Sequence, residues 1–196
     1  MDIPYSIEAR ADTGVTNATL GLWLFIASEV MLFGSLFSSY ALLRTGAATW
    51  PDQGAILNIP LASFNTLVLV ASSLAMIGGT RALATGQIRT FRLALGAVVL
   101  LGLVFLGIKG VEYADEVQRG LRPATNNFLG LYFVLTGLHA LHVAGGLMVN
   151  AWLLITASDS WLSAPAQLRN RVHAASLYWN FIDVVWVAMF VTLYLL

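Results

Sequence analysis

Seven polar side chains set within apolar stretches are the residues of this sequence that could do chemistry. Glu29 and Asp183 are embedded carboxyl groups, which we predict to belong to a proton network. His139, His142 and Asn180 are predicted to form a polar group near the midplane of a membrane. Lys109 and Glu112 are predicted to form an ion pair at the membrane boundary. Residues three apart share a helix face, so His139 with His142, and Asn180 with Asp183, should each form one hydrogen-bonding surface.

The composition determines what surrounds these groups. Of the 196 residues, 58% are hydrophobic and 10% are charged, which is far outside the range of soluble globular proteins and indicates a bilayer. Ten basic residues balance ten acidic ones, so no overall field would attract nucleic acid. The chain has no cysteine, which excludes disulfides, iron–sulfur clusters and cysteine nucleophiles.

Five segments are long enough to span a membrane. A spanning helix needs roughly 20 apolar residues, because about 30 Å of hydrocarbon is crossed at about 1.5 Å per residue. The sequence therefore predicts an all-α membrane protein, a single transmembrane domain over residues 1–196 with five helices. Their predicted ranges are 18–43, 61–84, 91–113, 128–156 and 172–196. A membrane β-barrel would need strands that alternate polar and apolar residues, and these runs do not alternate.

The distribution of basic residues predicts the orientation. One set falls at the ends of the helices that share a side with the N-terminus: Arg10, Arg81, Arg89, Arg92, Arg169 and Arg171. Arg44, Arg119 and Arg122 fall on the other side. The positive-inside rule then places the N-terminus in the cytoplasm and, after five spans, the C-terminus outside.

The polar side chains differ in depth. Glu29, His139, His142, Asn180 and Asp183 fall roughly 12 to 21 Å from the starts of their helices. An ionisable group at that depth costs on the order of 2.5 to 3.5 kcal/mol unless it finds a partner, so we expect these groups to face protein and at least two of their surfaces to meet. They could hold helices together or handle protons, and a protonated Glu29 is the preferred form.

Lys109 and Glu112 lie closer to the outer boundary, roughly 27 to 32 Å along their helix. A lysine there can extend to the surface and pair with a carboxylate, so a structural ion pair is favoured over a functional site.

A metal, haem or catalytic centre is not predicted in this chain. His139 and His142, on one helix, could share a metal but could not supply both axial ligands of a haem. A carboxylate-bridged di-iron site needs Glu-x-x-His motifs, and no glutamate precedes a histidine by three residues.

Five stretches, one on each predicted helix, resemble the motifs of haem-copper oxidase subunit III in the same order. They are residues 22–33 (LWLFIASEVMLF), 65–73 (NTLVLVASS), 109–113 (KGVEY), 136–143 (TGLHALHV) and 178–186 (YWNFIDVVW). The chain resembles the five-helix form of the family, which lacks two N-terminal helices.

The resemblance implies a subunit of a respiratory oxidase in the bacterial or archaeal cell membrane, where oxygen is reduced to water with proton translocation. Haems and copper would lie in the catalytic subunit I, on which this chain and other subunits assemble. The chain itself would hold no cofactor and would bind phospholipid. Glu29 matches the family's carbodiimide-reactive glutamate, which helps to sustain proton uptake.

One departure from the family pattern bears on the site. Where the last motif usually reads Trp-His-Phe, this chain has Asn180, which can form hydrogen bonds, including to Glu29, but cannot change charge. Two other functions remain open: an accessory subunit of a nitric oxide reductase, and a free-standing proton carrier built around Glu29.

Overall fold

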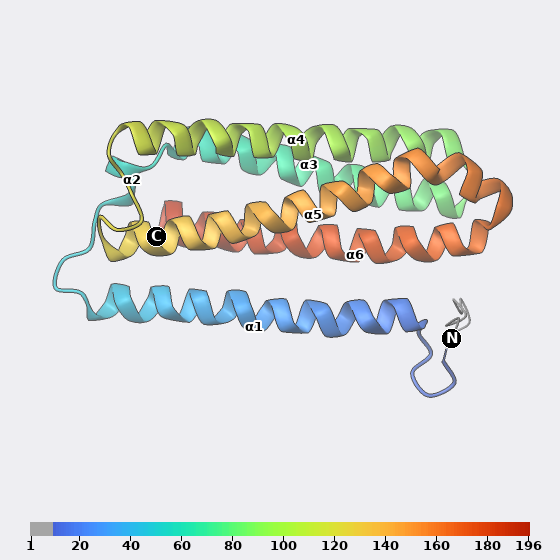
Figure 1. Cartoon of the computed structure of the whole chain (residues 1–196), viewed down its shortest axis with the longest axis horizontal. Coiled ribbons are helices and arrows are strands. Elements are labelled where there is room, and N and C mark those ends of the chain that lie inside the picture. The colour runs from blue at the N-terminus through green and yellow to red at the C-terminus, as the bar shows by residue number, and fades with distance from the viewer. Residues whose placement is uncertain (1–9) are drawn as a thin grey trace.

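The computed structural model describes residues 10–196, and within them the chain forms helices and no strand. The helices are α1 (Asn17–Gly46), the short α2 (Gln53–Ile56), α3 (Ile59–Ala84), α4 (Ile88–Gln118), α5 (Asn127–Ser163) and α6 (Pro165–Phe190), followed by the π-helical segment η1 (Val191–Leu195) (Figure 1). Five of the described helices are long and apolar enough to cross a membrane, with α6 and η1 forming one of them. The predicted fold class, an all-α bundle with five spans, is confirmed.

Local sequence signals explain where the helices begin and end. The side chains of Thr16, Asn58 and Asn126 accept hydrogen bonds from the first-turn amides of α1, α3 and α5, as N-cap residues do. Gly86 ends α3 with φ of +79°, a conformation that favours glycine, and the amide of Gln87 donates to the carbonyl of Ala82 at 2.8 Å. This tight turn makes α3 and α4 antiparallel neighbours.

The last loop is shorter than the sequence suggested. The fourth and fifth spans were expected to end at 156 and begin at 172, with Pro165 in the linker. In the structure α5 runs on to Ser163 and α6 begins at Pro165, so that only Ala164 separates them. Proline has no backbone N–H to lose in the first turn of a helix and its φ suits that position, so Pro165 starts the helix.

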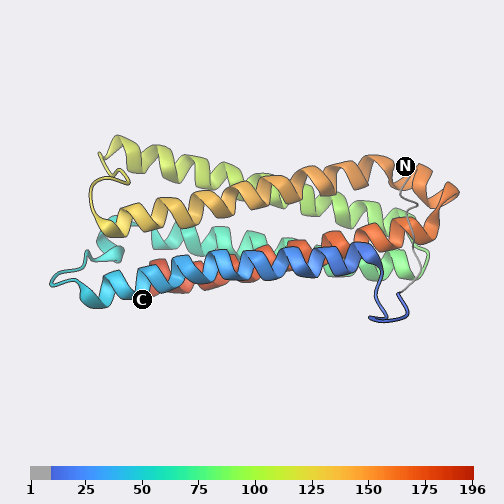
Figure 2. The same ribbon diagram turned by 60° about the horizontal axis from the view of Figure 1, so that its bottom comes forward.

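The helices form a four-helix bundle with one helix on its outside. Helices α3, α4, α5 and α6 pack together, whereas α1 runs along one side and packs on α5 and α6 (Figures 1 and 2). The outward face of α1 carries exposed Trp23, Leu24 and Met31, which fits contact with lipid or with another subunit.

Successive spanning helices run in opposite directions, so the two sets of arginines lie at opposite ends of the bundle (Figure 1). The side of the membrane on which each end lies stays a prediction from the positive-inside rule.

The core depends on a close approach between an indole ring and two glycines. Trp179 of α6 is buried, and its Nε1 donates to Ser72 Oγ of α3 at 3.0 Å. A Cβ atom at Gly146 of α5 would lie 2.9 Å from the Trp179 ring, and one at Gly102 of α4 would lie 3.0 Å from it. Trp179 thus contacts three helices, and small residues let the backbones approach closely enough for this packing.

Replacing Gly146 with alanine should therefore destabilise the chain by about 1 to 3 kcal/mol, because the added Cβ would lie 2.9 Å from the buried Trp179 ring. The matched control is Gly145→Ala, whose added Cβ would come no closer than 4.0 Å to the Tyr178 hydroxyl. Thermal dissociation of the chain from its purified complex would measure both. Equal losses of stability in the two variants would contradict this account of the core.

Candidate functional site

The first buried contact joins α1 to α5. Glu29 is 9% exposed, and its Oε2 lies 2.9 Å from His142 Nε2, although the angle is not that of a hydrogen bond. The other ring nitrogen, Nδ1, lies 2.8 Å from the carbonyl oxygen of Leu138. A carbonyl only accepts, so Nδ1 carries a hydrogen and Nε2 is the nitrogen free to gain or lose one.

This tautomer limits the charge states of the Glu29–His142 pair. An ionised carboxylate facing the lone pair of a neutral Nε2 would be repelled. The stable forms are a carboxylic acid beside a neutral imidazole, or a carboxylate beside an imidazolium. Both forms hold one shared proton and have no net charge, which suits a site inside a bilayer.

The second contact joins α3 to α6. Ser73 Oγ forms hydrogen bonds with Asp183 Oδ2 and with Asn180 Oδ1, the latter at 3.1 Å. Asn180 Nδ2 also lies 3.4 Å from Ser176 Oγ. Ser73 has one hydroxyl hydrogen for these two oxygen atoms, so both contacts become hydrogen bonds either when a protonated Asp183 donates to Ser73 or when the Asn180 amide turns its NH2 group toward Ser73.

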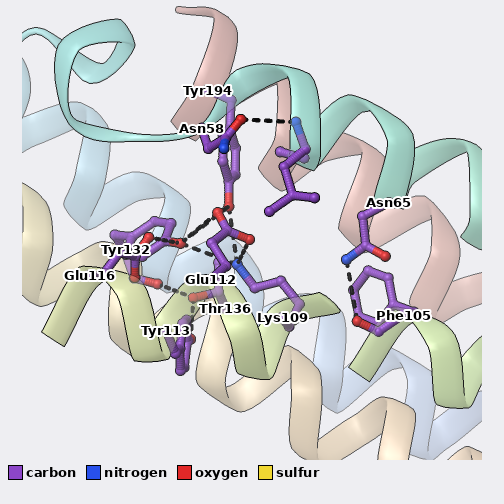
Figure 3. A network of polar contacts seen from close by, with 12 residues as sticks. Asn58, Asn65, Phe105, Lys109, Glu112, Tyr113, Glu116, Tyr132, Thr136 and Tyr194 are labelled. Carbon is purple, nitrogen blue, oxygen red and sulfur yellow. Dashed lines mark hydrogen bonds and ion pairs between the residues drawn. The ribbon is translucent and has the colours of Figure 1, made fainter. Parts of the chain in front are cut away.

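The third contact is larger and lies between α4, α5 and η1 (Figure 3). We use the name Lys109 cluster for Lys109, Glu112, Glu116, Tyr132 and Tyr194. Lys109 Nζ lies 2.9 Å from Glu112 Oε2 and 3.1 Å from each of the two tyrosine hydroxyls. The ion pair predicted between Lys109 and Glu112 is present. The expectation that Lys109 could extend to the surface is wrong, because these side chains surround the ammonium group and leave Lys109 only 4% exposed.

His139 and His142 do not form the single surface that their spacing predicted. His139 is fully buried, stacks on Trp186 of α6 with ring centroids 5.2 Å apart, and meets the edge of Phe105 of α4. Neither of its ring nitrogens has a hydrogen-bond partner among the described residues. Residues three apart differ by about 60° around a helix, enough here for His142 to face α1 while His139 faces the bundle core.

The predicted midplane group of His139, His142 and Asn180 is therefore three separate environments. Asn180 bonds to Ser73 and Ser176, and His142, not Asn180, lies against Glu29. The hydrogen bond from Asn180 to Glu29 that the sequence left open is not formed. The broader expectation holds, since Glu29, His139 and Asp183 all point into protein and Glu29 meets a histidine from another helix.

Four residues of these contacts were missed by sequence reasoning. Glu116 follows Lys109 and Glu112 at helical spacing, i, i+3 and i+7, so periodicity alone could have found it. Ser73 lies within the motif of residues 65–73. It gave no signal, because the hydroxyl of a serine in an apolar helix more commonly donates to a backbone carbonyl of its own helix. Tyr132 and Tyr194 come from other helices and gave no local signal.

Among residues 10–196, no three histidine, aspartate or glutamate side chains come together as ligands for a metal ion. The absence of a cofactor from this chain stays a prediction.

These features describe a multi-pass helical membrane protein in which four acidic side chains, Glu29, Glu112, Glu116 and Asp183, are buried and contact side chains of other helices. Its sequence matches the family described as cytochrome c oxidase subunit III over residues 8–196. The chain belongs to this family, and is thus subunit III of a haem-copper terminal oxidase.

Curated relatives agree with this membership. Cytochrome c oxidase subunit 3 of Bacillus sp. strain PS3 is 34% identical over 98% of this chain and 92% of its own length. Cytochrome bo(3) ubiquinol oxidase subunit 3 of Pseudomonas aeruginosa is 34% identical over 92% of this chain and 85% of its own length. Cytochrome c oxidase subunit 3 of Thermostichus vulcanus is 35% identical over 90% and 86%. These names give no support to a nitric oxide reductase subunit.

Ser73→Ala should cost about 1 to 3 kcal/mol of stability, because it leaves the buried Asp183 and the partly buried Asn180 without their shared partner. Ser63→Ala on the same helix is the control, since that hydroxyl bonds to the Ile59 carbonyl of its own helix. Thermal dissociation of the purified complex measures the difference, and an equally stable Ser73→Ala variant would count against the contact.

Lys109→Met should destabilise the chain by about 3 to 5 kcal/mol, because it leaves the buried Glu112 carboxylate without its cation. The double variant Lys109→Met/Glu112→Gln should recover much of this loss, since it removes the opposite charge as well. A double variant that is as unstable as the single one would show that packing, and not charge, sets the cost.

Proposed function

We propose that this chain is the non-redox subunit of its oxidase, one that stabilises the catalytic subunit, retains phospholipid and supports proton uptake. The observation that carries the proton part is the Glu29–His142 contact, a pair that holds one proton in either of its stable forms. The chemistry of the described residues supports the non-redox part, because the two histidines inside the bundle, His139 and His142, are enclosed or engaged by protein groups. His142 is held by Glu29 and Leu138, and His139 lies between two aromatic rings.

In this proposal the haems and copper belong to the partner subunit I. The relatives include subunits of oxidases named for cytochrome c and for ubiquinol. Since the same subunit occurs with both, we place the electron-donor site on other chains. Purification through a tag on this chain should bring down a large haem-bearing subunit, whereas the isolated chain should show no haem absorption. Stoichiometric haem in the isolated chain would refute the non-redox role.

A groove between α1, α5 and α6 supports the lipid part of the proposal. It has a volume of about 430 Å³ and its apolar wall includes Leu22, Phe25 and Trp152. Arg171 borders the groove, and its guanidinium lies 5.3 Å from the centre of the Trp152 ring. Acyl chains suit the apolar wall, and the arginine suits the phosphate of a headgroup at the end predicted to be cytoplasmic.

Glu29→Gln should leave the complex assembled, because the amide can donate to His142 Nε2 as a carboxylic acid would. The variant cannot release a proton, so we expect slower proton uptake during turnover or a shorter active lifetime. Ser28→Ala is the control, since the Ser28 hydroxyl bonds only to the Phe25 carbonyl of its own helix. Failure of Glu29→Gln to assemble would instead indicate a purely structural carboxyl group.

Ala174→Phe places a ring in the lipid groove and should lower the phospholipid retained by the purified complex by one molecule. Val184→Phe, on an exposed position of the same helix outside the groove, should leave the lipid content unchanged. Native mass spectrometry counts the bound lipids. Unchanged lipid in Ala174→Phe would exclude this groove as a binding site.

A further inference from the structure

Glu116 is the carboxyl group of the Lys109 cluster that lacks a cation. The side chain is 2% exposed, and its Oε1 lies 2.7 Å from the Tyr132 hydroxyl. Its other oxygen, Oε2, is buried and has no hydrogen-bond partner among the described residues. A buried carboxylate with one donor and one empty oxygen is poorly compensated.

Lys109 has no hydrogen left for Glu116. An ammonium group has three N–H bonds, and those of Lys109 point to Glu112 and to the hydroxyls of Tyr132 and Tyr194. Tyr194 donates its single hydrogen to Glu112 Oε1 at 2.9 Å. Glu112 therefore receives both the ion pair and a hydroxyl donor, and it is the ionised partner of Lys109.

Arg119 does not supply the missing charge. The Arg119 side chain is 46% exposed, and its Nε lies 3.2 Å from Asp115 Oδ2. Its Nη2 donates a hydrogen bond to the Ile56 carbonyl of α2 at 2.6 Å. With one buried ammonium group against two buried carboxyl groups, the Lys109 cluster has a net charge of −1 if both acids ionise. Desolvating such an unpaired charge is costly, and one bound cation removes that cost.

We propose that this cation is a proton and that Glu116 is a proton-binding site of the chain, separate from the Glu29–His142 pair. The acid carries its hydrogen on Oε1 and donates it to the Tyr132 hydroxyl. Tyr132 then donates its own hydrogen to Glu112 Oε1, 3.1 Å away. In this arrangement each hydrogen in the cluster has one acceptor, and the cluster is neutral. Figure 3 shows the contacts that connect these side chains.

The site can exchange its proton with one aqueous side. Glu116 lies near the C-terminal end of α4, which ends at Gln118, at the end of the bundle predicted to face outward. On release, Glu116 becomes a carboxylate and the proton passes to water there. The charged and titratable groups that face it from the surrounding elements are Lys109, Glu112, Tyr113 and Arg119 of α4, Tyr132 of α5 and Tyr194 of η1.

Infrared spectroscopy of the intact purified oxidase tests this proposal, because a protonated carboxylic acid has a carbonyl band that a carboxylate lacks. Glu116→Gln should remove one such band, sensitive to exchange into D2O, while the complex stays assembled, since a neutral amide replaces a neutral acid. The matched control, Asp115→Asn, removes an exposed carboxylate one residue away and should keep the band. Loss of assembly in Glu116→Gln would overturn the proposal.

A second variant tests the charge count directly. In Glu112→Gln the ammonium of Lys109 loses its counter-ion, and Glu116 should ionise to replace it, so the same band should disappear although Glu116 is still present. A band that survives in Glu112→Gln, or that is unaffected by Glu116→Gln, would contradict the proposal. So would a wild-type complex that lacks the Glu116 band and needs sodium for stability, because the bound cation would then be a metal ion. None of these outcomes depends on the role of Glu29.

Discussion

The need to neutralise acidic groups inside a bilayer is the constraint on which the rest of this structure depends. An uncompensated charge at that depth costs several kcal/mol, so each carboxyl group must share or hold a proton or find a cation. Glu29 lies against His142, Asp183 is hydrogen-bonded to Ser73, and Glu112 pairs with the cation Lys109. Three different kinds of partner thus serve one requirement.

The same contacts determine which helices lie together. Lipid tails are as apolar as leucine, so apolar surface alone gives no strong preference for one helix arrangement over another in a membrane. Glu29 of α1 contacts His142 of α5, and Ser73 of α3 is hydrogen-bonded to Asp183 of α6. Tyr132 of α5 is hydrogen-bonded to Glu116 of α4. Trp179 adds packing that only glycines at 102 and 146 allow. Polar pairing selects the neighbours, and close packing then fixes their separation.

Sequence reasoning succeeded where the cause is local and failed where it is not. Hydrophobic length predicted the five spans, and the cost of buried charge predicted that Glu29 and Asp183 face protein. Spacing could not predict their partners, because Ser73 and Tyr194 lie on other helices and look ordinary in the sequence. Spacing also misled for His139, since two residues on roughly one helix face can still meet different neighbours when several helices surround them.

The replacement of the usual histidine by Asn180 is explained by this separation of contacts. Asn180 belongs to the group of Ser73 and Asp183, where it accepts from Ser73, a task that an amide oxygen fulfils without changing charge. The imidazole that lies beside Glu29 belongs to His142 of α5. The asparagine at position 180 does not affect that imidazole. The substitution therefore removes a titratable group from the α3–α6 contact and leaves the Glu29–His142 contact between α1 and α5 intact. A proton role for Glu29 is compatible with asparagine at position 180, because the two polar groups do not depend on each other for hydrogen bonds.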